Sequence, residues 1–297
     1  MFDKLLKKLS TLSKSASFVK NKSHVSGEPT PLTDYLKKTT INERPSGIPS
    51  IDCIYVINLD HRKDRWNRLS ELFSKMNLNV NRFSAIIGSQ LTTRQRQEMS
   101  GPYPILLSGD EIGCLLSHLS IIKDAYDRGF STVWILEDDV EFLEEAKALV
   151  PYIKNLCAID KEWDILYTDT NSRDPLNGYF HPIDVPARPH QHLPPFNELA
   201  KRVPVGFDLE RLGVRYGMGS VIYSRRGLEK VYNYFAHLYL WFPFDWDIHL
   251  IPDIREYGIT RDMITNLRHG FAGNIKRGMI NQMLEYFMYQ DLFQESD

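Results

Sequence analysis

The 297-residue sequence has few cysteines, no long apolar run and no excess of either charge. Its three cysteines (Cys53, Cys114 and Cys157) lie far apart in apolar runs, which excludes a disulfide framework and favours buried, reduced thiols. No apolar run reaches the roughly 18 residues that would span a bilayer. Lys plus Arg number 36 against 38 for Asp plus Glu. This balance gives no long-range attraction for nucleic acid, so we expect no nucleic-acid partner.

The amino-terminal residues 1–22 differ from the rest of the chain in carrying six lysines and one acid. Their apolar residues recur at steps of three and four, as in an amphipathic helix. Such a helix either contacts anionic lipid as a peripheral anchor or packs on its own domain. The segment lacks the apolar centre of a signal peptide, which favours a cytoplasmic protein, with the inner membrane face as one location. Residues 23–50 read as a linker before a domain at 51–297.

From residue 51 onward, short β-branched and aromatic runs alternate with segments of helical periodicity. This alternation predicts an α/β fold, in which a parallel or mixed sheet carries helices on both faces. Residues 171–215 lack periodicity and are expected to form a lid, a binding loop or a disordered segment. The expected strands are 53–58, 79–87, 132–136, 163–167 and 218–223, and the expected helices are 60–77, 109–128, 144–156 and 224–236.

Three adjacent carboxylates, Glu137, Asp138 and Asp139, directly follow the apolar strand 132–136. Because ligands of open α/β sheets bind beyond the carboxyl ends of strands, this run lies where a site is expected. Mutual repulsion of the three charges would be relieved by a hard cation such as Mn²⁺ or Mg²⁺. The alternative is an acidic start of the following helix, where carboxylates favour the helix dipole.

The helix expected at 109–128 opens with a capping box made by Ser108 and Glu111. Helical spacing puts Glu111 and His118 on its apolar side, so each needs a polar partner or a ligand. For His118 we favour a structural role, and the role of Glu111 stays open between structure and ligand contact.

A third acidic motif places Asp245 and Asp247 among Trp241, Phe244 and Trp246. Aromatic rings that pack on sugar rings, with carboxylates that bond hydroxyls, suit a carbohydrate site. Two exposed acids on a solvated loop are the alternative. The basic residues 268–277 follow, and they either neutralise phosphate or cover a helix end.

Several motifs follow one another along the chain in a fixed order. They are YVINLD (55–60) with Arg62, Asp64, Arg65 and Trp66, then GDEIGCLLSH (109–118), WILEDDV (134–140), YSRRG (223–227) and FPFDWD (242–247). Over residues 51–250 they resemble the motifs of glycosyltransferase family 25, with Asp110 as an insertion in the family pattern. That family includes bacterial lipopolysaccharide glycosyltransferases and resembles the galactosyltransferases that modify collagen.

The resemblance implies a GT-A type, Rossmann-like mixed sheet that binds a UDP-sugar with Mn²⁺ or Mg²⁺. It further implies transfer of a hexose, galactose or glucose, to a glycan or glycolipid acceptor such as lipopolysaccharide, with inversion by direct displacement. The residues that it assigns are Asp139, Asp138 and His269 for the metal, Asn58, Arg62, Arg65, Glu111 and Asp138 for the donor, and Asp245 or Asp247 as general base, with Asp169 in reserve.

Two other classes of protein are compatible with parts of this pattern. A catalytically decayed, glycan-binding protein would keep the fold without dependence on nucleotide or metal, although the intact run at 137–139 argues against decay. A metal-dependent hydrolase or nucleotidyltransferase would also use clustered acids, but the sequence lacks a glycine-rich phosphate loop.

Overall fold

The computed structural model describes residues 31–42, 44–170, 188 and 191–266. In that part of the chain, no helix has both the length and the apolar character needed to cross a membrane. The amphipathic helix expected at 1–22 and the metal ligand expected at His269 lie outside the described residues. Part of the expected linker is described, and it packs on the domain: Leu32, in the short helix η1 (Pro31–Tyr35), is fully buried in the core.

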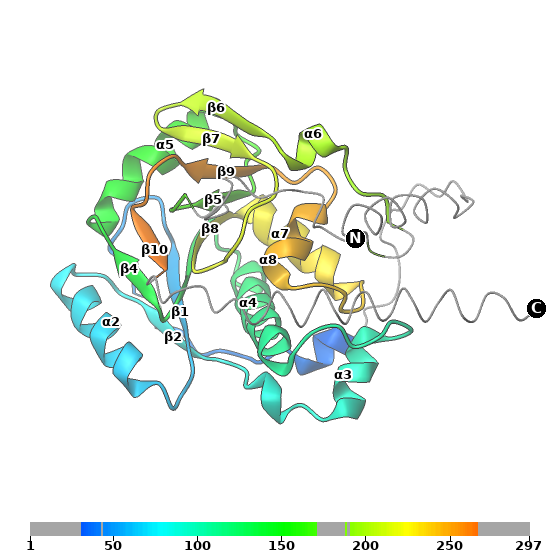
Figure 1. Cartoon of the computed structure of the whole chain (residues 1–297). Coiled ribbons are helices and arrows are strands. Elements are labelled where there is room, and N and C mark those ends of the chain that lie inside the picture. Colours follow the sequence, from blue (N-terminus) through cyan, green and yellow to red (C-terminus); the bar gives the residue numbers. More distant parts are fainter. Residues whose placement is uncertain (1–30, 43, 171–187, 189–190, 267–297) are drawn as a thin grey trace, which may run out of the picture.

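Among the described residues, eight strands form one mixed sheet in the order β2-β1-β3-β8-β5-β9-β7-β6 (Figure 1). β1 pairs in parallel with both β2 and β3. β8 is antiparallel to its neighbours β3 and β5, so that β1, β3 and β5 all run in the same direction. The strands are β1 (Cys53–Asn58), β2 (Asn81–Ser84), β3 (Thr132–Glu137), β5 (Ile165–Tyr167), β6 (Arg202–Gly206), β7 (Leu209–Leu212), β8 (Ser220–Ser224) and β9 (Glu256–Ile259).

Helices cover both faces of this sheet (Figure 1). Alternate side chains of β1 enter two separate cores, with Tyr55 on one face and Ile54 on the other. The core around Tyr55 includes α4 (Gly109–Asp127) and α7 (Arg225–Ala236), and the core around Ile54 includes α2 (Lys63–Lys75) and α5 (Leu149–Ile159). The expected fold class, a mixed α/β sheet flanked by helices, is confirmed.

Smaller elements connect these layers. β4 (Val140–Phe142) pairs antiparallel with β10 (Ile264–Asn266) in a separate two-stranded sheet. The others are η2 (Gly88–Gln90), α3 (Thr93–Ser100), η3 (Ala146–Ala148), α6 (Phe196–Leu199), α8 (Phe244–Asp247) and η5 (Ile248–Leu250).

The structure corrects three expectations from the sequence. The hairpin β6–β7 lies inside the region 171–215, where no regular element was expected. The helix expected at 144–156 is divided into η3 and α5, and Pro151 lies in the first turn of α5, where its missing N–H is tolerated. Burial of all cysteines is wrong, because Cys114 and Cys157 are exposed.

The start of α4 is fixed by a close backbone approach to the segment after β2. A Cβ atom on Gly88 would lie 1.7 Å from the carbonyl oxygen of Gly109 and 2.7 Å from the amide nitrogen of Gly113. In the same contact, the amide of Ile86 donates to Oγ of Ser117 at 2.8 Å. Glycine at position 88 therefore lets the start of α4 lie against the segment that follows β2.

We expect Gly88→Ala to lower the free energy of unfolding by about 1–3 kcal/mol, the usual cost of overpacking, because the new methyl group meets backbone that cannot rotate away. Urea denaturation checks this value. Ser89→Ala, at the exposed neighbouring position, is the matched control and should leave the midpoint unchanged. Equal stability of the two variants would contradict the close approach.

Candidate functional site

The carboxyl ends of β1 and β3 bring the first two polar motifs together at one edge of the sheet. Asn58 is the last residue of β1, and Glu137 is the last residue of β3. Because the two strands are parallel neighbours, Asp138 and Asp139 continue from β3 beside the end of β1. β8 runs in the opposite direction, so its beginning, which Gly217 shortly precedes, lies at the same edge.

Asp138 is the buried anchor of this edge. Its Oδ2 accepts a hydrogen bond from Nδ2 of Asn58 at 2.6 Å, and its Oδ1 forms an ion pair with Arg65 at 2.6 Å. The guanidinium of Arg65 also lies 3.5 Å from Asp139. Both carboxylate oxygens of Asp138 are therefore engaged by α2 and β1, which orients the backbone that carries Asp139.

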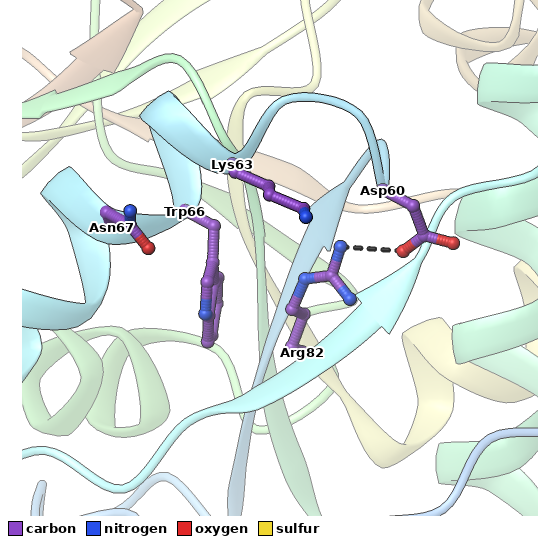
Figure 2. Close-up of a pocket in the computed structure, with 5 residues that line it drawn as sticks. All are labelled: Asp60, Lys63, Trp66, Asn67 and Arg82. Atoms are coloured by element: carbon purple, nitrogen blue, oxygen red, sulfur yellow. Dashed lines mark hydrogen bonds and ion pairs between the residues drawn. The ribbon is translucent and has the colours of Figure 1, made fainter.

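The same hydrogen-bond network reaches a pocket of about 400 Å³ at the beginning of α2. Arg82 donates through Nε to Oδ1 of Asn58 at 2.8 Å and pairs with Asp60 at 2.7 Å. Its guanidinium carbon lies 5.6 Å from the ring centroid of Trp66, so that a cation and an aromatic ring line the pocket together. Figure 2 shows the five residues that line the pocket, which are Asp60, Lys63, Trp66, Asn67 and Arg82. The pocket thus offers a flat aromatic surface and positive charge.

Glu137 interacts with α4 on the other side of the strand end. Its Oε1 lies 3.0 Å from Nε2 of His118 and 3.7 Å from Sγ of Cys114. His118 is fully buried, and its ring stacks on Phe244 with centroids 5.2 Å apart. Burial opposes ionisation of Glu137, but the hydrogen bond and charge of His118 outweigh it and lower the pKa of Glu137. The expected structural role of His118 fits this contact.

Asp139 and Asp245 are the two acids of this edge whose pKa values are raised and which have no buried arginine as their described partner. Burial and the charge of Glu137 raise the pKa of Asp139 to about 6. Oδ2 of Asp245 accepts a hydrogen bond from the amide of Gly217 at 2.9 Å. Burial raises the pKa of Asp245 too, and the charge of Glu137 adds to the shift. The charge of Glu137 thus raises the pKa of both Asp139 and Asp245. The acidic run at 137–139 and the acids of α8 therefore influence each other electrostatically.

Asp247, two residues further along α8, lies in different surroundings. It is 1% exposed, and its carboxylate forms a buried ion pair with Arg188 and accepts a hydrogen bond from Tyr234 at 3.2 Å. Asp169, the reserve candidate for the base, pairs with buried Arg215 at 2.7 Å. These two carboxylates are paired with buried arginines, whereas Asp245 accepts a hydrogen bond from the backbone amide of Gly217.

Two of the residues expected near a donor have local partners of their own. Arg62 pairs with Asp64 at 2.9 Å at the exposed beginning of α2. Glu111 accepts a hydrogen bond from the amide of Ser108 at 2.7 Å and so completes the expected capping box of α4.

Glu137 was expected in the acidic run, but sequence reasoning missed its contact with Cys114 and His118 and the role of Arg82. Arg82 lies on β2, far from any acidic motif, and only the parallel pairing of β1 and β2 brings it to Asn58. The spacing of Cys114 and His118 on one helix was the available signal for the contact with Glu137, because residues four apart share a helix face.

The carboxylate oxygens at this edge of the sheet are suitable ligands for a hard divalent cation at Asp139. A Mg²⁺-type ion is usually held by one or two carboxylates together with the phosphates of a substrate. Burial and the charge of Glu137 raise the pKa of Asp139, and a cation beside it would favour the ionised carboxylate. Asp138 supports Asp139 through the shared contact with Arg65.

Comparison with known proteins gives one family for this part of the chain. Residues 51–175 match the family described as glycosyltransferase family 25 (LPS biosynthesis protein). Human procollagen galactosyltransferase 2 is 32% identical over 126 residues, which is 39% of this chain and 20% of the relative. A glycosyltransferase 25 family member of Drosophila melanogaster is 30% identical over 146 residues, 46% of this chain and 24% of the relative.

A further relative carries a different description. The probable inactive glycosyltransferase 25 family member 3 of Bos taurus is 28% identical over 143 residues, 45% of this chain and 24% of the relative. The matched segment thus spans between a fifth and a quarter of the length of these three curated relatives.

Proposed function

Residues 51–175 belong to glycosyltransferase family 25, as the motifs predict, and from this premise we propose that the chain transfers a sugar from a nucleotide-sugar to a glycan acceptor. The observation that carries the proposal is the meeting of Asn58, Arg65 and Asp139 at the carboxyl edge of β1 and β3. At this edge Arg65 would bind the phosphates of a nucleotide-sugar, and Asp139 would bind a cation. Such a combination suits a leaving group that is a nucleoside diphosphate.

For the donor we propose a UDP-sugar that carries a hexose, galactose or glucose. The pocket beside Trp66 and Arg82 suits a planar nucleobase, because an aromatic ring and a guanidinium both stack on flat rings (Figure 2). The diphosphate would extend from this pocket along Asn58 toward Arg65. Arg62 flanks that path at the start of α2.

In this proposal Asp139 holds Mn²⁺ or Mg²⁺, with Asp138 keeping Arg65 and the strand end in place. The bound cation would supply positive charge that stabilises the departing diphosphate. Arg65 adds a second positive charge that does not depend on the cation. We leave His269 as a further candidate ligand, since it lies outside the described residues.

For the base we propose Asp245. Its ionised carboxylate would accept the proton of an acceptor hydroxyl while the hydroxyl oxygen forms a bond to the anomeric carbon. The bond from that carbon to the diphosphate oxygen breaks on the opposite side, and its electron pair leaves with UDP, which inverts the anomeric configuration. The amide of Gly217 holds Oδ2 of Asp245, and in this proposal the other oxygen accepts the proton.

For the acceptor we propose a glycan or glycolipid, with lipopolysaccharide as the first to test because the matched family description names LPS biosynthesis. In this proposal the protein works in the cytoplasm, at the inner face of the membrane. Residues 1–22, with their six lysines, would then supply a peripheral contact with anionic lipid.

Calorimetric titration with UDP tests the proposal. We expect UDP to bind with Mn²⁺ present and to bind much more weakly after EDTA treatment, because the diphosphate and Asp139 would share the cation. Asp139→Asn should lose this metal dependence, since an amide is a poorer ligand and carries no charge. Asp110→Asn, on the exposed first turn of α4, is the control and should bind as the wild type does.

The same titration separates the enzyme from its main alternative. Absence of UDP binding in both conditions would contradict the transferase and favour a decayed, glycan-binding protein, in keeping with the name of the Bos taurus relative. If UDP binds with Mn²⁺ and Asp139→Asn retains that dependence, the metal lies elsewhere.

A further inference from the structure

Three side chains of different chemistry meet beside the proposed donor site. Cys114 and His118 lie four residues apart on one face of α4, and Glu137 ends β3. A sulfur, a ring nitrogen and a carboxylate oxygen from these residues all lie within 4.8 Å of one another. We propose that Cys114, His118 and Glu137 form a binding site for a thiophilic divalent cation of the Zn²⁺ class, distinct from the oxygen site at Asp139.

The distances fit a common ion. Zinc binds thiolate at about 2.3 Å and imidazole or carboxylate at about 2.0–2.2 Å, so donors around one tetrahedral Zn²⁺ lie roughly 3.3–3.8 Å apart. Here Oε1 of Glu137 is 3.7 Å from Sγ of Cys114 and 3.0 Å from Nε2 of His118. The first distance lies in this range, the second is slightly shorter, and Sγ of Cys114 lies within 4.8 Å of Nε2 of His118.

Two of the three donors are held in place before any ion arrives. The ring of His118 is fully buried and stacked on Phe244, so its Nε2 remains directed at Glu137. Glu137 is the terminal residue of a central strand, paired on both sides. Cys114, by contrast, is exposed, which gives an ion a path from solvent and leaves a fourth position for water.

The local charge also favours a cation. In the metal-free protein, a proton must lie between Nε2 of His118 and Oε1 of Glu137, because both atoms otherwise present lone pairs. A metal ion would replace that proton, which would move to Nδ1 of the ring or to solvent, and the proton of the Cys114 thiol, which would be released to solvent. Asp139 and Asp245 add negative charge near the thiol.

The three ligand atoms, a sulfur, a ring nitrogen and a carboxylate oxygen, determine which kind of metal ion the site prefers. Thiolate and imidazole favour Zn²⁺ and similar ions, whereas Mg²⁺ and Mn²⁺ favour carboxylates and phosphates. The proposed thiol site and the proposed Asp139 site would therefore take different metals. This inference needs neither a nucleotide nor a sugar, so it stands apart from the proposed transfer reaction.

Titration of the full chain with Co²⁺ and Zn²⁺, without nucleotide, tests the site. We expect Co²⁺ to produce a thiolate-to-metal charge-transfer band and Zn²⁺ to displace it at a stoichiometry of one. Cys114→Ser should abolish the band and weaken Zn²⁺ binding by more than the roughly 10–100-fold lost when only an outer partner of a metal ligand is removed. Cys157→Ser, the other exposed cysteine, is the matched control and should keep both signals.

Two results would overturn the site. One is a wild-type protein that binds Co²⁺ without a charge-transfer band, since the ion would then lie on oxygen or nitrogen donors alone. The other is a Cys114→Ser variant that binds Zn²⁺ as tightly as the wild type. Because Cys114 is exposed, the metal-free variant should melt at the wild-type temperature, which confirms that any lost binding is not lost folding. The UDP titration is unaffected by either result.

Discussion

Replacing Asp245 by asparagine is expected to lower the turnover of sugar transfer by roughly 10²–10⁴-fold, the range typical of a removed general base. The amide cannot accept the acceptor's proton, yet its oxygen can still accept the hydrogen bond from Gly217. The surrounding fold and the affinity for UDP should therefore stay unchanged. Turnover measured with saturating donor, together with calorimetry of UDP, separates the two effects.

The pH dependence gives a second test of Asp245. Because burial raises its pKa, the ionised base disappears at a higher pH than an ordinary aspartate would require. The rate of the wild type should fall about tenfold per pH unit below that pKa, and the residual rate of Asp245→Asn should lack this limb. Unchanged turnover in Asp245→Asn would show that the base lies elsewhere, with Asp169 as the next candidate.

The same substitution should also change stability. A carboxyl group whose pKa is higher in the folded than in the unfolded state destabilises the fold at neutral pH, where both states are ionised. Asparagine removes that charge, so the melting temperature of Asp245→Asn is expected to rise while activity falls. A gain in stability with a loss of rate is typical of a functional, electrostatically strained residue.

Asp247→Ala is expected to do the opposite and to lower the free energy of unfolding by about 3–5 kcal/mol. The change removes the carboxylate from its buried pair with Arg188 and leaves a guanidinium that is 3% exposed without its counter-charge. The hydrogen bond from Tyr234 is lost as well. Urea denaturation of the two variants, two residues apart on α8, provides a matched comparison. If Asp247→Ala keeps the wild-type free energy of unfolding but loses turnover, Asp247 and not Asp245 would be the candidate for the general base.

The sequence allowed the core of the fold to be predicted because its apolar residues follow simple periods. β1 and β3 are continuous apolar runs, and both are central strands buried on two faces. The hairpin β6–β7 was missed because β6 lies at the edge of the sheet, is mostly exposed and contains Pro204, so its sequence shows neither alternation nor a continuous apolar run.

The part of the candidate site that lies at the ends of paired strands was predictable from the sequence. Pairs of side chains that no strand pairing brings together were not. Asn58 and Asp138 are 80 residues apart, yet their meeting follows from two parallel strands that end together. The pairing of Asp247 with Arg188 across 59 residues follows from no local pattern. The sequence therefore left Asp245 and Asp247 equivalent, and only burial and partners distinguish them.

The turn that carries Asp138 and Asp139 is held from both sides. β3 before it belongs to the large sheet, and β4 after it belongs to the separate pair with β10. Arg68 donates from one side to the carbonyl oxygens of Asp138 and Val140, at 3.1 and 2.9 Å. A ligand that binds at Asp139 therefore meets a preorganised backbone, and little of its binding free energy is lost to conformational entropy.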